Sequence, residues 1–273
     1  MTDNINKTYP CEAILYRNGG NIAFEQELIK EEPLMIRMEG NPYTVVMRTP
    51  GEERAHAAGF CLTEGIVESI DDFATLGHCA EMDPNVIEIR LTEKRLAEAS
   101  DLLNRRGFIS QTSCGLCGRE LIKEIVQDLP PITDNSAITA EQALGCFNLL
   151  NDHQQFYKTT RGSHAALLCD IELNLISVAE DVGRHNALDK AIGKAFICNT
   201  LKDARIAVLS SRISYELVQK AARAGVPILL SVSRPTSFAV EIGKKLNMTL
   251  ACTDRDSGLI ILCGSKRLSI QSP

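Results

Sequence analysis

The sequence predicts an α/β protein with a smaller α+β domain at its N-terminal side. From about residue 163 onward, strand-like apolar runs alternate with helix-like runs, which is typical of a parallel or mixed sheet covered by helices on both faces. Upstream of that point, the patterns indicate a hairpin and separate amphipathic helices. The length of 273 residues suits two domains. We expect the smaller domain over residues 12–109 and the α/β domain over residues 110–273.

The first half contains short elements separated by turn and capping signals. Residues 1 to about 30 indicate a frayed start followed by an alternating stretch. The patterns then predict a hairpin with strands over 33–41 and 43–47, a helix over 49–62, a strand over 86–91 and a helix over 92–107. These elements form the small α+β domain, and their polar residues converge on no recognisable site.

The second half follows a proline-rich segment. A helix over 121–129 ends at Pro130-Pro131, residues 130–136 are the best candidate linker, and Thr139-Ala-Glu-Gln142 is a capping box that opens the next helix. We then expect strands at 165–169, 175–179, 206–209, 228–231, 249–252 and 259–262, and helices at 186–197, 214–224 and 237–246.

Composition and charge exclude several classes of function. The net charge of −6, the absence of Trp and an aromatic content of 5% argue against a nucleic-acid binder, which needs basic and stacking side chains. The N-terminus lacks the apolar core of a signal peptide, and no apolar run approaches the ~20 residues that span a bilayer. Eight of the ten cysteines are scattered singly, several inside apolar runs, so we expect a reducing cytoplasm and small buried thiols.

The other two cysteines, Cys114 and Cys117, are the reactive candidates. They have C-x-x-C spacing in Ser110-Gln-Thr-Ser-Cys-Gly-Leu-Cys-Gly-Arg119, just before an apolar-periodic helix. A zinc site would need a second ligand pair and a zinc deaminase an H-x-E motif; the sequence has neither, so we expect no metal. A thioredoxin-like redox dithiol, an inert structural pair and a nucleophilic or carrier thiol stay open. The nearby helix N-terminus and basic residues would lower a thiol pKa, which favours the carrier.

Polar loops that contain arginine follow four of the predicted strands. These loops are Glu180–Asn186, Ser210–Ser214, Ser231–Ser237 and Thr253–Gly258. Ligands of open α/β sheets bind at the carboxyl ends of the strands, and the first three loops also lead into helix N-termini, which favour anions. Arg184, Arg212 and Arg234 would offer guanidinium groups to a phosphate. For any single loop, helix capping is the better explanation, but arginine in all four favours a phosphate-bearing ligand.

Five stretches together resemble a known family. They are Thr112–Gly118, Glu180–Lys190, Ser211–Lys220, Gly59–Gly65 and Pro235–Glu241, and the most specific is Glu180-Asp-Val-Gly-Arg-His-Asn-Ala-Leu-Asp-Lys190. From about residue 12 to the C-terminus, the sequence resembles the formate dehydrogenase accessory sulfurtransferases, the FdhD family. The resemblance implies a cytidine-deaminase-like three-layer α/β/α domain beside the smaller α+β domain, in a homodimer.

The resemblance also implies a function. Members of this family take sulfur as a persulfide from a cysteine desulfurase. They deliver it to the molybdenum (or tungsten) bis(molybdopterin guanine dinucleotide) cofactor, a bound client that is then inserted into formate dehydrogenase. On this sequence the persulfide position falls on Cys114, and Cys117 would assist. No intrinsic metal is implied. An insertion chaperone that binds the cofactor without sulfur transfer is the alternative.

The implied cofactor site combines the guanine-dinucleotide stretch of the family with the other strand-end loops. Thr253 stands where relatives often have an aromatic residue, and Asp254 and Asp256 add negative charge. The choice between molybdenum and tungsten stays open, as do the separate roles of Glu180, Asp181, His185 and His164. The expected cofactor-binding residues are Thr253, Asp254, Arg255, Asp256, Ser257, Gly258, Arg184, His185, Ser211, Arg212 and Ser233.

Overall fold

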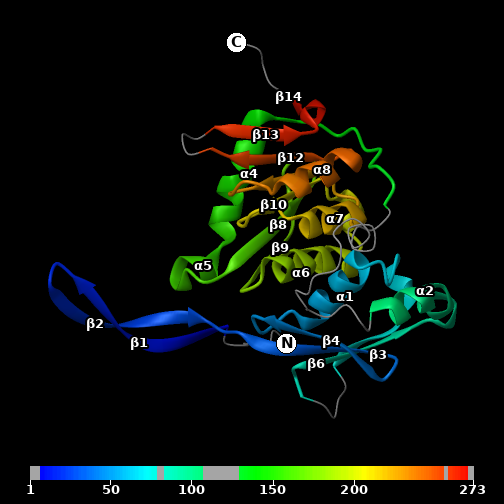
Figure 1. Ribbon diagram of the computed structural model, residues 1–273, viewed down its shortest axis with the longest axis horizontal. Helices are drawn as coiled ribbons and strands as arrows, with labels where there is room; N and C mark the ends of the chain where they lie inside the picture. Colours follow the sequence, from blue (N-terminus) through cyan, green and yellow to red (C-terminus); the bar gives the residue numbers. More distant parts are fainter. Residues whose placement is uncertain (1–6, 79–82, 107–128, 255–257, 270–273) are drawn as a thin grey trace, which may run out of the picture.

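Two β-sheets connected by a pair of crossing helices form the body of the protein, and a long hairpin projects from it (Figure 1). The computed structural model describes residues 7–78, 83–106, 129–254 and 258–269. The helix expected over 121–129 lies outside these ranges except for its last residue. Cys114, Cys117, Arg255, Asp256 and Ser257 also lie outside the described residues.

The projecting hairpin consists of β1 (Thr8–Arg17) and β2 (Gly20–Ile29), which pair antiparallel along their whole length. Asn18 and Gly19 connect them with φ values of 53° and 81°, as a two-residue type I′ turn requires. The expectation of a frayed start missed this hairpin. The Asn-Gly dipeptide between two alternating runs is the signal that could have found it.

The first sheet has four strands in the order β4-β3-β6-β5. The predicted hairpin, the strand over 86–91 and both predicted helices are confirmed. Strand β5 was not predicted, because its six residues are largely exposed and lack a clear alternation. The elements of this part are β3 (Glu32–Met38), β4 (Asn41–Arg48), α1 (Glu53–Thr63), β5 (Phe73–His78), β6 (Val86–Leu91) and α2 (Glu93–Arg106).

The second sheet has six strands in the order β13-β12-β11-β10-β8-β9, and all six were predicted. The elements of this part are β7 (Ile138–Thr139), α4 (Ala140–His153), α5 (Gln155–Thr160), β8 (His164–Cys169), β9 (Leu175–Asp181), α6 (Arg184–Ile197), β10 (Ile206–Leu209), α7 (Tyr215–Arg223), β11 (Ile228–Ser231), α8 (Ser237–Lys245), β12 (Thr249–Thr253), β13 (Leu259–Cys263) and β14 (Leu268–Ser269). Thr139 and Gln142 form the predicted capping box of α4.

Helices cover both faces of the six-stranded sheet. On one face, Leu168, Leu209 and Leu229 belong to a core that includes residues of α6, α7 and α8. On the other face, Leu167 and Val208 pack with buried residues of α4. The first core also contains the buried side of the four-stranded sheet, so both sheets share it. The predicted boundary between residues 109 and 110 lies outside the described residues and stays a prediction.

The segment expected to be a linker, residues 130–136, has no helix or strand but is bound to the α/β part. The N–H of Ile132 donates to the carbonyl of Leu246. Arg267 donates twice to the carbonyl of Asp134, whose carboxylate forms an ion pair with Arg205 at 2.9 Å. Within the described ranges, no helix is long and apolar enough to cross a membrane.

Helices α1 and α6 cross with their backbones in contact. A Cβ atom at Gly59 would lie 1.8 Å from the carbonyl oxygen of Asp189, and a Cβ atom at Gly193 would lie 1.8 Å from that of Ala55. No real side chain tolerates such a distance, so only glycine fits at both positions. The crossing joins the two halves of the chain, because α1 lies between β4 and β5 of the four-stranded sheet, whereas α6 follows β9 of the six-stranded sheet (Figure 1).

The crossing predicts that any side chain at Gly59 is destabilising. We expect Gly59→Ala to lower the free energy of unfolding by at least about 2 kcal/mol, because the backbone of α6 has to move. The matched control is Gly145→Ala in α4, where an added Cβ atom meets nothing within 4 Å; it should stabilise by about 0.5–1 kcal/mol. Urea denaturation of both variants measures the difference, and similar stabilities would contradict the close contact.

Candidate functional site

The predicted strand-end loops lie along one edge of the six-stranded sheet. Strands β10, β11 and β12 are parallel, and β8 is antiparallel to both β10 and β9. The carboxyl ends of β9, β10, β11 and β12 therefore share one edge, at the left in Figure 1, where β8 and β13 begin. We call this the strand-end edge. The topology brings together loops that are separated by about twenty residues each in the sequence.

Each described candidate residue has a place on this edge. Arg184 and His185 form the first turn of α6, after β9. Ser211 and Arg212 follow β10, and Ser233 follows β11. Thr253 is the last residue of β12, and the turn into β13 is closed by a 2.8 Å hydrogen bond from the N–H of Asp254 to the carbonyl of Gly258.

Two arginines on the strand-end edge lack acidic partners. Among the described residues, the guanidinium groups of Arg184 and Arg212 form no ion pair or hydrogen bond, and the Nε of Arg184 is buried without a partner. Arg184 is also the first residue of α6, whose N-terminus has no side-chain cap. A cation at the positive end of a helix dipole is unfavourable without an anion nearby. These positions therefore suit a negatively charged ligand.

His185 lies next to Arg184 and faces the start of α7. Its Nε2 is 3.3 Å from the hydroxyl of Ser214 and 3.8 Å from the carboxylate of Glu216. The neighbouring His185 lowers the pKa of the Glu216 carboxyl to about 2. Glu216 therefore stays ionised at any physiological pH and orients the imidazole. Sequence reasoning did not select Glu216, although a first-turn position in the helix that follows a strand-end loop was the available signal.

His164 belongs to the same edge, which its sequence context did not show. It is the first residue of β8, and its Nδ1 is 3.5 Å from the hydroxyl of Ser210. Burial and the positive charge of Arg184 lower the pKa of His164. The imidazole is therefore neutral near pH 7 and adds no charge to the two arginines.

The stretch predicted to bind guanine dinucleotide has one described acidic residue, Asp254, and this residue is paired with an arginine. Asp254 forms a 2.9 Å ion pair with Arg234, so its charge does not oppose the unpaired arginines. Thr253 donates its hydroxyl to the carbonyl of Val232 at 3.1 Å and thereby connects the ends of β12 and β11. The side chains of Asp254 and Thr253 therefore hold the loops of the strand-end edge in place.

The motif over 180–190 divides into two groups of residues with different contacts. Arg184 and His185 face the edge, whereas Asp181 is fully buried and accepts four hydrogen bonds. Its donors are the N–H of Thr49 (3.0 Å), the N–H of Gly183 (2.8 Å), Asn186 Nδ2 (2.9 Å) and Lys190 Nζ (2.6 Å). Lys190 also donates to the carbonyl of Thr49 at 2.7 Å. We call these residues the Asp181 clamp.

Glu180 and Asp189 are structural as well. The Glu180 carboxylate accepts the N–H groups of Phe156 and Tyr157, both at 2.8 Å, and so holds the start of α5. Asp189 forms a 2.9 Å ion pair with the buried Lys220 of α7 and accepts the hydroxyl of Thr63 at 2.8 Å. The roles that the sequence left inseparable are therefore distinct in the structure.

The single cysteines of the described residues are free thiols, and most are buried as expected. Cys61, Cys146, Cys169, Cys252 and Cys263 are buried, whereas Cys11 is half-buried and Cys198 is exposed. Cys252 lies near the strand-end edge, where burial raises the pKa of its thiol. It is a poor nucleophile at neutral pH.

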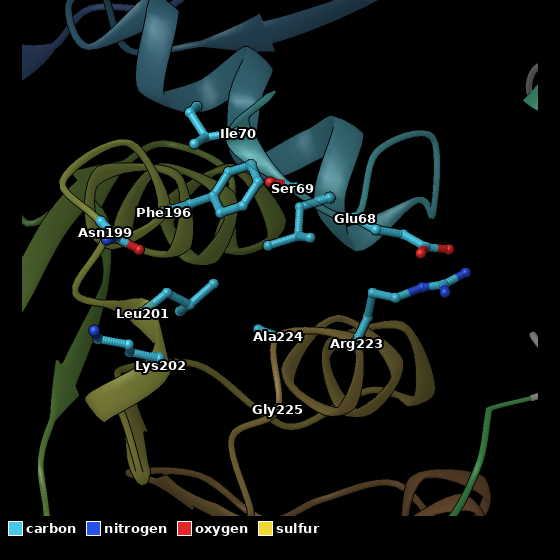
Figure 2. A pocket seen from close by; sticks show the side chains of 11 residues that line it. Glu68, Ser69, Ile70, Phe196, Asn199, Leu201, Lys202, Arg223, Ala224 and Gly225 are labelled. Atoms are coloured by element: carbon cyan, nitrogen blue, oxygen red, sulfur yellow. The ribbon is translucent and has the colours of Figure 1, made fainter. Parts of the chain in front are cut away.

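A cavity of about 340 Å³ lies away from the strand-end edge (Figure 2). It is bordered by the C-terminal end of α7 at Arg223 and by the turns that follow α6. Phe196, Leu201 and Ile70 form its apolar lining. None of the predicted site residues within the described ranges lines it. It therefore contributes nothing to the predicted site.

The fold and the strand-end edge define the class first: a mixed α/β protein whose strand ends favour an anionic ligand. Residues 29–269 match the model of the FdhD/NarQ family, so the chain belongs to this family. The resemblance carried by the five sequence stretches is thereby confirmed.

The similar proteins cover almost the whole chain. A sulfur carrier protein FdhD from Streptomyces avermitilis is 33% identical over 96% of this chain and 95% of its own length. Proteins of the same name from Mycolicibacterium paratuberculosis and Bordetella bronchiseptica are each 35% identical, over 92% and 88% of this chain and 94% and 86% of their own. A Desulfotalea psychrophila structure described as a formate dehydrogenase accessory protein has a TM-score of 0.75, covering 96% of this chain and 99% of that one at 18% identity, and supports the fold.

The Asp181 clamp predicts a large stability loss when its cation is removed. Lys190→Met leaves the Asp181 carboxylate buried without a counter-charge, so we expect a loss of about 3–5 kcal/mol in the free energy of unfolding. The matched control is Lys244→Met on the exposed surface of α8, which should change it by less than about 0.5 kcal/mol. Denaturation at pH 7 measures both, and a small loss for Lys190→Met would contradict the clamp.

Proposed function

We propose that this chain is a sulfur carrier that serves formate dehydrogenase. It receives persulfide sulfur on Cys114 from a cysteine desulfurase and passes it to a molybdenum or tungsten bis(molybdopterin guanine dinucleotide) cofactor, which is its substrate. The observation that carries the proposal is that Arg184 and Arg212 on the strand-end edge have no acidic partner within the described part of the chain. Curated relatives across the length of the chain are named sulfur carrier proteins.

The strand-end edge supports a ligand with a diphosphate. Guanidinium groups bind phosphate oxygens through two parallel N–H donors, and the uncapped N-terminus of α6 adds backbone N–H groups. Ser211 and Ser233 provide further polar groups beside Arg212 and Arg234. The turn between β12 and β13 would hold the guanine end, with contacts through the backbone because Thr253 cannot stack.

The sulfur steps are exchanges between thiols. The Cys114 thiolate attacks the terminal sulfur of the donor persulfide, the bond between the donor's two sulfurs breaks, and the donor leaves as a thiolate. Cys117 thiolate then attacks the Cys114 sulfur of the persulfide, which releases the terminal sulfur as hydrosulfide to the metal. The thiol pair supplies the two electrons and ends as a disulfide. A dithiol reductant must restore it before the next cycle.

The proposal also includes the type of α/β fold, the oligomeric state, the location and the partner of the protein. We assign the helix-covered six-stranded sheet to the cytidine-deaminase-like class, since its three parallel strands are flanked by antiparallel ones and its faces carry helices. We further propose a homodimer, a cytoplasmic location and formate dehydrogenase as a partner, because the resemblance to the family implies all three. The alternative of an insertion chaperone without sulfur transfer uses the same arginines but makes the thiols dispensable.

The thiol roles predict a specific mass change. After incubation with a cysteine desulfurase and cysteine, the wild-type protein should gain one reducible sulfur atom, because Cys114 receives the persulfide. Cys114→Ala should gain none and Cys117→Ala should retain it, as read by intact mass with and without a reductant. Cys198→Ala, which removes an exposed thiol elsewhere, is the control. Labelling of Cys114→Ala would make the assignment wrong, and active formate dehydrogenase in cells with Cys114→Ala would favour the chaperone.

The anion site predicts stabilisation by a guanine nucleotide. GDP at ten times its dissociation constant should raise the melting temperature by about 3 °C, because it binds only the folded state. Arg184→Gln and Arg212→Ala should each weaken GDP binding about 10- to 100-fold, as expected for a lost hydrogen bond to a charged group.

Arg90→Gln, at an exposed position of β6, is the matched control and should leave the GDP shift unchanged. Absence of any shift at millimolar GDP would contradict the nucleotide site. An equal loss in all three variants would indicate a nonspecific charge effect and contradict the role of the two arginines.

A further inference from the structure

The cavity of about 340 Å³ lies where the two halves of the chain meet (Figure 2). Leu62 and the turn over 68–70 form its wall from the first half. Phe196, Leu201 and Ala224 belong to its wall from the second half. Ligand pockets occur preferentially at such junctions and have volumes of about 300–1,000 Å³. The cavity therefore has the position and the size of a small-molecule site.

This cavity is separate from the strand-end edge. Helices α6 and α7 begin at that edge, and Phe196 near the end of α6 and Arg223 at the end of α7 line the cavity. At 1.5 Å per residue, Arg184 at the start of α6 lies about 18 Å from Phe196 along the helix. A ligand in the cavity would therefore not touch the proposed cofactor site, and its binding does not depend on sulfur transfer.

Hydrogen bonds fix the wall from the first half. The Asp72 carboxylate accepts the N–H groups of Glu68 at 2.7 Å and of Ser69 at 3.0 Å. Arg95 Nε donates to the carbonyl of Ile66 at 2.8 Å, just before this turn. The turn is therefore held by the protein itself and does not need a ligand to order it.

The wall from the second half is equally defined. Asn199 and Gly225 have φ values of 57° and 73°, the left-handed conformation that commonly ends a helix. The N–H of Thr200 donates to the carbonyl of Ala195 at 2.9 Å and closes the turn after α6. Both walls are thus formed in advance, as the walls of ligand pockets usually are.

The middle of the cavity is apolar. Figure 2 shows Ile70 and Phe196 above the hollow and Leu201 below it. These three side chains are only half-buried, so each retains apolar surface that a ligand could cover. The lining residues surround the hollow in this view, which suits a compact group better than an extended chain. Removal of this surface from water favours a ligand with an apolar body.

The charges around the cavity favour one negative charge on the ligand. Lys202 is exposed, and its ammonium group forms no ion pair or hydrogen bond among the described residues. Arg223 is a second cation, whereas Glu68 is balanced by Arg95 at 3.4 Å. The C-terminal ends of α6 and α7 oppose an anion, but each amounts to only about half a charge. The two full positive charges outweigh them by about one unit.

We propose that this cavity binds a small organic anion that has an aromatic or branched aliphatic body and a single acidic group. The body packs against Ile70, Phe196 and Leu201, and the acidic group faces Lys202. An organic cation would meet Lys202 and Arg223 without a free acid to bind it. A nucleotide would bring several charges to apolar walls.

The test is calorimetric titration of the full chain with anilinonaphthalene sulfonate, an aromatic monoanion. The wild type should bind one molecule of the dye per chain. Lys202→Glu reverses an exposed charge and should weaken binding at least about 10-fold, as expected for a lost contact to a charged group. Lys244→Glu, the same change at an exposed position of α8, is the matched control and should bind as the wild type does. Ala224→Leu, which fills the cavity, should abolish binding.

Two further measurements separate this cavity from other surfaces that attract the dye. Phenylnaphthylamine, which lacks the sulfonate, should bind the wild type and Lys202→Glu equally. Arg212→Ala, at the strand-end edge, should bind anilinonaphthalene sulfonate with the wild-type affinity. The proposal is overturned by a wild type without saturable binding, by equal affinities of Lys202→Glu and Lys244→Glu, or by loss of binding in Arg212→Ala. The lysine variants decide the case in which Ala224→Leu fails to fold.

Discussion

The rest of the site depends on the hydrogen bonds and the ion pair that the buried carboxylate of Asp181 forms. A carboxylate shielded from water is tolerated only when its lone pairs are satisfied and its charge is balanced, and Asp181 meets both conditions through Thr49, Gly183, Asn186 and Lys190. These donors come from the end of β4, the start of α6 and its second turn. The same bonds therefore fix the backbone on both sides of Arg184 and His185 and so orient these two side chains. Their position at the strand-end edge is a consequence of the clamp.

The glycine contact between α1 and α6 makes the clamp possible. Because Gly59 and Gly193 let the helices touch, the charged groups beside them are closed off from water, including Lys190 and Lys220. His56 lies in the same interface, where burial and these two lysines lower its pKa well below the usual value. A neutral imidazole keeps the contact electrically balanced at pH 7.

Local patterns predicted the six strands of the second sheet and helices α4, α6, α7 and α8, but not the short elements α5, β7 and β14. The strand order then brought the polar loops to one edge. The sequence could not separate the roles of Glu180, Asp181 and His185, because all three are polar residues of one short motif and only the fold decides which side chain turns inward. Glu216 was not selected, and the role of His164 stayed open, for a related reason: each becomes part of the edge only through strand pairing or helix docking. The β1–β2 hairpin was not predicted, although Asn18-Gly19 marks its turn. Its apolar residues are mostly exposed and belong to neither hydrophobic core, so they gave no sign of a packed strand.

The negative net charge of the chain is compatible with the proposed anion site, because some basic residues have acidic partners and others have none among the described residues. Most buried cations have a carboxylate within ion-pair distance, as Arg48 has Glu53 and Lys220 has Asp189. Arg184 and Arg212 have none among the described residues, and Asp254, the described acidic residue of the stretch predicted to bind the cofactor, is paired with Arg234. The electrostatic potential around Arg184 and Arg212 is therefore positive, although the net charge of the chain is negative. The proposed binding of an anion depends on this local imbalance, which neither composition nor isoelectric point reveals.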